Sequence, residues 1–178
     1  LQLIVEDLLE LCRLENILPR EESNYSALNL EQLVEGAWNS IRPLADQRDV
    51  SLSINTHEPG PLLGDQRRLH RAVLNLLDNA LRYSPYHGFV EVDILPSGGW
   101  WLLCVRDHGP GLSETDLSNM FQRFYRGDPS RARSNRSGSG LGLAIVQQIA
   151  VNHGGRVQAR NHPEGGTSME LLLPKGPA

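Results

Sequence analysis

The chain has 178 residues, 39% of them hydrophobic, which is enough to bury the core of one domain of ordinary size. Its formal net charge of −4 argues against a general nucleic-acid-binding protein, so we expect no nucleic-acid partner. Cys12 and Cys104 form neither a C-x-x-C motif nor a disulfide framework, which fits a reducing compartment, and no signal peptide or membrane-length apolar run is visible.

Residues 1–18 predict an amphipathic helix. Its apolar side chains follow the 3-4-3 spacing of a coiled-coil seam, at Leu1, Ile4, Leu8 and Leu11. Either this helix packs on its own domain, or it is the end of a longer dimerising hairpin; the pattern alone favours neither. Because the chain starts without Met in the middle of the pattern, we expect a fragment of a longer protein. The polar residues that follow predict a linker over 19–27.

In the rest of the chain, the sequence pattern predicts three longer helices and five strands. The helices are expected after the cap residue Asn29, over 65–82 and over about 140–152, and the strands over 50–54, 89–95, 100–106, 156–160 and 167–173. Pro43 should bend or weaken the first of these helices. Residues 112–137 are long, polar and irregular, and such a connection is usually a lid, a binding loop or a disordered segment.

Two asparagines, Asn75 and Asn79, are four residues apart and so lie on one side of the 65–82 helix, opposite its apolar face. One interpretation is a solvated face. The other is a pair of amide oxygens offered to a hard cation such as Mg²⁺, with arginines nearby for phosphate.

Two glycine-containing stretches are candidate ligand sites. Gly138, Gly140 and Gly142 run into the last predicted helix, whose first N–H groups could bind phosphate; otherwise the stretch is a flexible loop or a tight packing contact. Asp107 ends a predicted strand and is followed by glycines. It could point a carboxylate into a cleft, or simply form an Asp/Gly turn.

Five short motifs in this order resemble the catalytic, ATP-binding domain of sensor histidine kinases, within the GHKL superfamily of gyrases, heat-shock chaperones, histidine kinases and mismatch-repair proteins. They are NLLDNALRYS (75–84), DHGPG (107–111), FQRFYR (121–126), GSGLGLAI (138–145) and GGT (165–167), which are similar to the N box, the DxGxG box, the F box, the second glycine box and the last box. The resemblance implies a Bergerat-type α/β sandwich of a mixed five-stranded sheet and three helices. It implies a catalytic domain over 28–178, with an ATP lid at about 112–138, and it identifies residues 1–18 as the end of the dimerisation hairpin.

The resemblance also implies the roles of single residues. Asn79 would hold Mg²⁺, Asp107 would accept a hydrogen bond from the amine of adenine, and Thr167 would help to hold that base. Arg126 would reach the γ-phosphate, and Asn75 and Arg82 would belong to the catalytic set. The remaining nucleotide contacts would come from Tyr83, Gly109, Gly111, Gly138, Gly140, Leu141 and Gly142.

Two departures from the family pattern bear on the activity. Arg82 stands where the family often has lysine, and the two side chains are not interchangeable. Asn75 stands where hydrolytic GHKL proteins carry a glutamate that activates water. An amide cannot act as a general base, so we expect the site to hold ATP without rapidly hydrolysing it.

The implied function is transfer of the γ-phosphoryl group of Mg·ATP to a histidine on the protein's own dimerisation domain, for relay to an aspartate of a response regulator. None of the six histidines lies in a phosphoacceptor motif, so this chain lacks the acceptor. The resemblance implies a cytoplasmic domain, with membrane attachment only through segments outside this chain. Two alternatives are a GHKL-type ATPase or chaperone clamp, and a degenerate interaction module that binds no nucleotide.

Overall fold

The structure, a computed structural model, describes residues 2–16, 24–57, 61–127 and 139–175. One layer is a five-stranded sheet in the order β2-β4-β5-β7-β6. These strands are Ser51–Thr56, Phe89–Ser97, Trp100–Arg106, Thr167–Pro174 and Arg156–Asn161. β2 and β4 are parallel and the other neighbours are antiparallel, so the expected mixed five-stranded sheet is confirmed.

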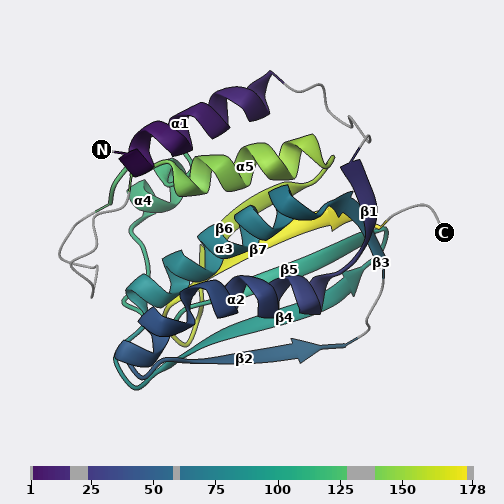
Figure 1. The fold of residues 1–178 in the computed structure, drawn as a ribbon. Helices are drawn as coiled ribbons and strands as arrows, with labels where there is room; N and C mark the ends of the chain where they lie inside the picture. Colours follow the sequence, from purple (N-terminus) through teal and green to yellow (C-terminus); the bar gives the residue numbers. More distant parts are fainter. Residues whose placement is uncertain (1, 17–23, 58–60, 128–138, 176–178) are drawn as a thin grey trace.

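Three helices cover one face of this sheet, as Figure 1 shows: α2 (Leu30–Gln47), α3 (Gln66–Tyr83) and α5 (Gly142–Asn152). Asn29 caps α2 as predicted, because its side chain accepts a hydrogen bond from the N–H of Gln32 at 3.1 Å. α2 continues past Pro43 to Gln47. Within the described residues, no helix combines the length and the apolar character that crossing a bilayer would need.

The core lies between the helices and the sheet. Apolar side chains recur on one side of each helix, and those of α3 are almost completely buried, in one core cluster with alternate residues of β4 and β5 and with residues of β7. They include Leu69, Val73, Leu76 and Leu77 from the helix and Val92, Leu103, Val105 and Leu171 from the sheet. The opposite side of α3, which carries Asn75 and Asn79, is half-buried.

A small second sheet was not predicted from the sequence. β1 (Tyr25–Asn29) pairs antiparallel with β3 (Pro61–Asp65). β1 begins inside the 19–27 segment expected to be a linker, so that expectation is wrong for its last three residues. β1 leads into α2 and β3 leads into α3, so this pair of strands sets where both helices begin.

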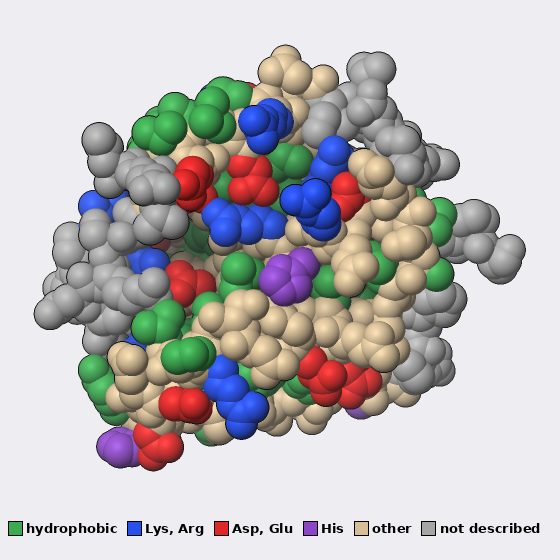
Figure 2. Space-filling view, viewed as in Figure 1, with side chains coloured by type: hydrophobic (Ala, Val, Ile, Leu, Met, Phe, Trp, Pro, Cys, Tyr) green, Lys and Arg blue, Asp and Glu red, His purple; other side chains and the backbone are tan. Residues whose placement is uncertain are grey.

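The first helix, α1 (Gln2–Glu15), lies over α5 in Figure 1. It packs through Leu11 and Leu14, which are buried, whereas Ile4 and Leu8 of the predicted seam are exposed. With Val5 and Leu9 they form an apolar strip, and Figure 2 shows hydrophobic side chains gathered along this part of the surface. The helix therefore packs on its own domain with one side and leaves the expected seam largely uncovered.

The predicted lid is not wholly irregular. It contains a short helix, α4 (Glu114–Asn119), which the sequence analysis did not anticipate. Ser113 and Asp116 form a reciprocal capping box at its start. Residues 128–138 of the predicted lid lie outside the described residues.

Candidate functional site

Asp107 lies directly after β5 and is only 2% exposed. Its Oδ1 accepts hydrogen bonds from the backbone N–H of Gly109 at 2.8 Å and of Thr167 at 3.3 Å. Its own N–H donates to the Thr167 carbonyl at 3.0 Å. Burial raises the pKa of the Asp107 carboxyl above its ordinary value, and the N–H groups of Gly109 and Thr167 oppose that shift. The result is a buried carboxylate fixed by backbone donors at the end of the central strand of the sheet.

The loop after Asp107 passes close to the end of α3. A Cβ at Gly109 would lie 2.7 Å from the carbonyl oxygen of Tyr83 and 2.9 Å from Oδ1 of Asp107, so only glycine fits. Further along, beyond Gly111, the Asn161 side chain accepts from the N–H of Leu112 and donates to its carbonyl, both at 2.8 Å. Asn161 was not among the predicted residues, and nothing in the local sequence marks it.

The half-buried side of α3 meets the start of α5. Asn75 donates from Nδ2 to the carbonyl oxygen of Gly142 at 3.1 Å, so the amide joins the two helices. Asn79 lies one turn further along the same side. Arg82 pairs with Asp78 of the same helix at 3.2 Å.

The glycine-rich stretch turns sharply before α5. Gly140 has a φ of +72°, and a Cβ there would lie 2.9 Å from the Phe124 backbone. Both facts require glycine at this position. The carbonyl of Gly140 accepts a hydrogen bond from the N–H of Phe124 at 2.9 Å, which joins the F box to this loop. Leu141 is the N-cap of α5, and its own apolar side chain makes no capping hydrogen bond. Gly138 lies outside the described residues.

The F box is anchored through Tyr125, whose hydroxyl donates to Oδ1 of the buried Asp116 at 2.8 Å. The next residue, Arg126, is exposed. Phe124, two residues before Arg126, bonds to Gly140 of the glycine-rich turn, and among the described residues no hydrogen bond or ion pair joins Arg126 to Asn75 or Asp107.

A residue that sequence reasoning missed, Arg48, supports the end of α3. Its guanidinium is buried and donates to the carbonyl of Leu81 and, at 2.6 Å, to that of Ser84. These are carbonyls of the last turn of a helix, which have no partner within the helix itself. Arg48 thereby fixes the position at which α3 gives way to the following loop, next to Tyr83.

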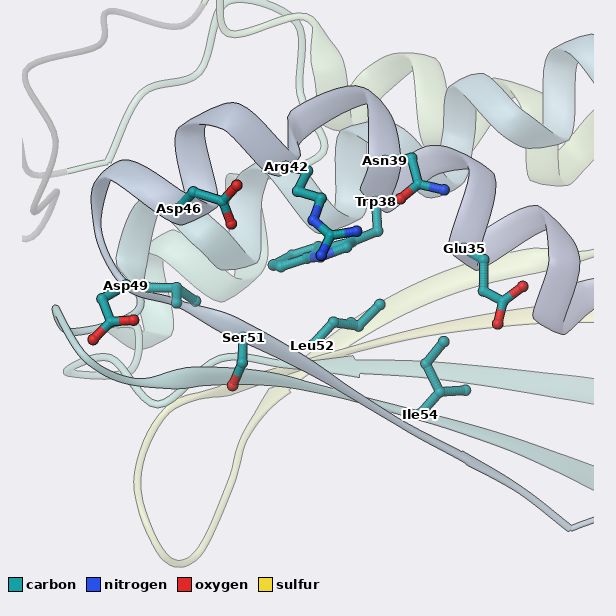
Figure 3. Close-up of a pocket in the computed structure, with 10 residues that line it drawn as sticks. Glu35, Trp38, Asn39, Arg42, Asp46, Asp49, Ser51, Leu52 and Ile54 are labelled. Atoms are coloured by element: carbon teal, nitrogen blue, oxygen red, sulfur yellow. The ribbon is translucent and has the colours of Figure 1, made fainter.

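A separate hollow of about 520 Å³ lies between α2 and β2. Figure 3 shows Trp38 and Arg42 of α2 facing Leu52 and Ile54 of β2 across it, with Glu35 and Asp46 at its rim. None of the predicted site residues lines this hollow. We therefore do not assign the ligand site to this hollow, because the buried carboxylate, the backbone donors and the amides described above do not line it.

The structure thus brings most of the predicted residues to one region, where three elements meet: the half-buried side of α3, the loop between β5 and α4, and the glycine-rich turn before α5. The contacts join these residues in two groups along α3: Asn75 with Gly142, and, at the end of the helix, Tyr83 with Gly109, Asp107 and Thr167; Gly140 contacts Phe124. These residues include a carboxylate, carboxamides and the backbone N–H groups at the start of α5, and N–H groups at a helix N-terminus can bind an anionic ligand.

Comparison with known proteins identifies the family to which this chain belongs. Residues 64–177 match the family model described as histidine kinase-, DNA gyrase B-, and HSP90-like ATPase. The sensor protein SphS of Synechococcus elongatus is 43% identical over 98% of this chain and 44% of its own length. The sensor-like histidine kinase SenX3 of Mycobacterium bovis is 35% identical over 96% of this chain and 41% of its own length. The chain spans less than half the length of these relatives.

Solved structures give the same result. The mycobacterial sensor histidine kinase MprB superposes with a TM-score of 0.74 at 31% identity, over 86% of this chain and 99% of that one. Full-length ShkA, solved in complex with AMPPNP, gives a TM-score of 0.83 at 25% identity, over 98% of this chain and 36% of that one. The chain belongs to the histidine kinase-, gyrase B- and HSP90-like ATPase family. Within that family, its sequence relatives are sensor histidine kinases, and its fold is that of their catalytic, ATP-binding domains.

Proposed function

We propose that this domain binds Mg·ATP in the cleft between α3, the Asp107 loop and the glycine-rich turn, and transfers the γ-phosphoryl group to a histidine on the dimerisation domain of its parent protein. A response-regulator aspartate then receives the phosphoryl group. The observation that carries the proposal is the buried Asp107 carboxylate, fixed by Gly109 and Thr167 beside the end of α3.

Adenine recognition follows from the chemistry of Asp107. A carboxylate only accepts hydrogen bonds, and the exocyclic amine of adenine only donates them. Guanine presents a carbonyl at the equivalent position, so two acceptors would face each other and the site would reject GTP. Gly109 leaves room for a flat base beside the carboxylate, since a side chain there would meet both Tyr83 and Asp107. Thr167 and the loop at Gly111 complete this end of the cleft.

The phosphates would lie at the other end of the cleft, at the N-terminus of α5. Gly140, Leu141 and Gly142 supply backbone N–H groups there, with Gly138 preceding them. Asn79 is the residue on α3 that would hold Mg²⁺, because a carboxamide oxygen suits a hard cation that keeps phosphate and water as its other ligands. Bound Mg²⁺ neutralises charge on the phosphates. Arg82, which pairs with Asp78, and the exposed Arg126 are the cations that we assign to the γ-phosphate.

Asn75 distinguishes phosphoryl transfer from hydrolysis. Its carboxamide is not basic, and it donates to the Gly142 carbonyl, so it does not activate water. An incoming imidazole nitrogen forms the new bond to the γ-phosphorus while the bond to the bridging oxygen breaks and ADP leaves. The protein contributes positioning and charge stabilisation. We also propose that the domain functions on the cytoplasmic side, as part of a dimeric parent.

Phosphotransfer with the full-length parent tests the proposal, with this chain as the control that lacks an acceptor. The parent should label itself on histidine from γ-labelled ATP, and this chain should not. Rapid steady-state ATP turnover by this chain would instead favour the ATPase or chaperone-clamp alternative. Absence of adenine-nucleotide binding would favour the degenerate interaction module.

A further inference from the structure

The carboxylate of Asp7 on α1 contacts two parts of the candidate site at once. The residue is only 7% exposed. Its Oδ1 pairs with Arg71 of α3, one turn before Asn75, and its Oδ2 accepts a hydrogen bond from the Ser139 hydroxyl at 2.8 Å. Ser139 belongs to the glycine-rich stretch that directly precedes α5. One residue of α1 therefore contacts both α3 and the glycine-rich stretch.

Ser139 in turn occupies one of the N–H groups proposed to bind phosphate. Its Oγ accepts a hydrogen bond from the N–H of Leu141 at 3.1 Å. A serine hydroxyl has one hydrogen to donate and two lone pairs. Because the hydrogen goes to Asp7, the lone pairs face Leu141. A phosphate oxygen and the Ser139 hydroxyl would compete for that N–H group.

The position of Asp7 depends on the docking of α1. Leu11 and Leu14 pack in the core, the carbonyl of Leu14 accepts from Nδ2 of Asn152 at 2.9 Å, and Glu15 pairs with Arg123 of the F box. When α1 is docked, Asp7 is held over Ser139. When α1 moves away, the Ser139 hydroxyl loses its acceptor and can rotate off Leu141.

We propose that Asp7 is a positioning residue which, while α1 is docked, holds the Ser139 hydroxyl on the Leu141 N–H and so withholds a phosphate donor from the nucleotide. The inference rests on the proposed function, since it concerns the phosphate end of the same cleft. It makes α1 docking and triphosphate binding mutually unfavourable, and such coupling is reciprocal by linkage. Movement of α1 in the parent protein would then change nucleotide affinity without any change in the residues that contact adenine.

Calorimetric titration of this chain with Mg·AMPPNP and with adenosine tests the proposal. Asp7→Ala and Ser139→Ala should each tighten AMPPNP binding about 2- to 12-fold, the equilibrium effect of one hydrogen bond, and leave adenosine affinity unchanged. The double variant should gain no more than either single variant, because both act through the same N–H group. Glu10→Ala is the matched control. Glu10 lies on the same helix, 3.4 Å from Nε of the same Arg71, so its removal should leave both affinities unchanged.

A second measurement, hydrogen exchange of the α1 amides, starts from the unmodified chain. In the unmodified chain, AMPPNP should accelerate hydrogen exchange of the α1 amides, and in Ser139→Ala that acceleration should be lost. Unchanged or weaker AMPPNP binding in both single variants would overturn the role of Asp7 while leaving ATP binding itself in place. An equal gain in Glu10→Ala would also overturn it, because general loosening of α1 would then explain the effect. Failure of the unmodified chain to bind either ligand would instead refute the proposed function, and this inference with it.

Discussion

Replacing Asp107 with asparagine separates ligand recognition from stability. The two side chains have nearly the same shape, and the amide oxygen can still accept from Gly109 and Thr167 at the position of Oδ1. The second carboxylate oxygen, however, becomes an NH₂ group that faces the amine of adenine, donor against donor. A hydrogen bond to a charged group contributes about 1.5–3 kcal/mol, so Asp107→Asn should weaken AMPPNP binding about 10- to 150-fold.

The stability of the unliganded protein should respond differently. Burial raises the pKa of Asp107, which means that its ionised form is disfavoured in the folded state, so at neutral pH the charge reduces stability. Removing the charge in Asp107→Asn should therefore leave the melting temperature unchanged or raise it. Calorimetric titration and thermal unfolding measure the two quantities on the same sample. Affinity that stays within twofold would refute the assignment of Asp107 to adenine. A melting temperature that falls together with affinity would show a structural role instead.

Three further predictions concern residues around the site. Burial lowers the pKa of His153 below its ordinary 6.5, and the neutral ring accepts a hydrogen bond from the N–H of Asp65 at 3.1 Å. The contribution of the neutral ring to stability is therefore complete above pH 6.5 and decreases as the pH falls below it. Urea unfolding across pH 5–8 should show this decrease in stability, and the decrease should be smaller in His153→Gln. Gly140→Ala should destabilise the fold by about 1–2 kcal/mol, because the φ of +72° disfavours a side chain. It should also weaken the binding of AMPPNP but not of adenosine. Equal losses for both ligands would contradict a phosphate role for this turn. Arg48→Ala should reduce the free energy of unfolding by about 2–4 kcal/mol, because it leaves the Leu81 and Ser84 carbonyls unpaired. Arg48→Lys should not restore the lost stability, since one ammonium group cannot replace the guanidinium fork. Full recovery by lysine in the same unfolding assay would refute this explanation.

The elements with strong local signals were predicted closely. α3 was expected over 65–82 and spans Gln66–Tyr83, because its apolar period is clear and Asp65 caps it by accepting from the N–H of Arg68 at 3.1 Å. The hairpin of β4 and β5 was likewise marked by its Pro-Ser-Gly-Gly connection. The five motifs indicated candidate site residues because each motif is a local run of sequence.

What could not be predicted depends on contacts between distant residues. β1 is a five-residue strand whose partner, β3, begins more than thirty residues later, so no local pattern marked it. Arg48 and Asn161 support the site through backbone groups 33 and 49 residues away, and an arginine just after a helix or an asparagine at the end of a strand carries no such signal. In α1, periodicity located an apolar stripe, but it could not tell that Leu11 and Leu14 face the domain while Ile4 and Leu8 do not.

The most direct test of the whole account is a crystal structure of this chain with Mg·AMPPNP. The account predicts that the adenine amine lies within hydrogen-bonding distance of Asp107, that the Asn79 amide oxygen lies about 2.1 Å from Mg²⁺, and that the phosphates lie at the start of α5. Density for the nucleotide elsewhere, for example in the hollow between α2 and β2, with Asp107 and Asn79 untouched, would contradict it.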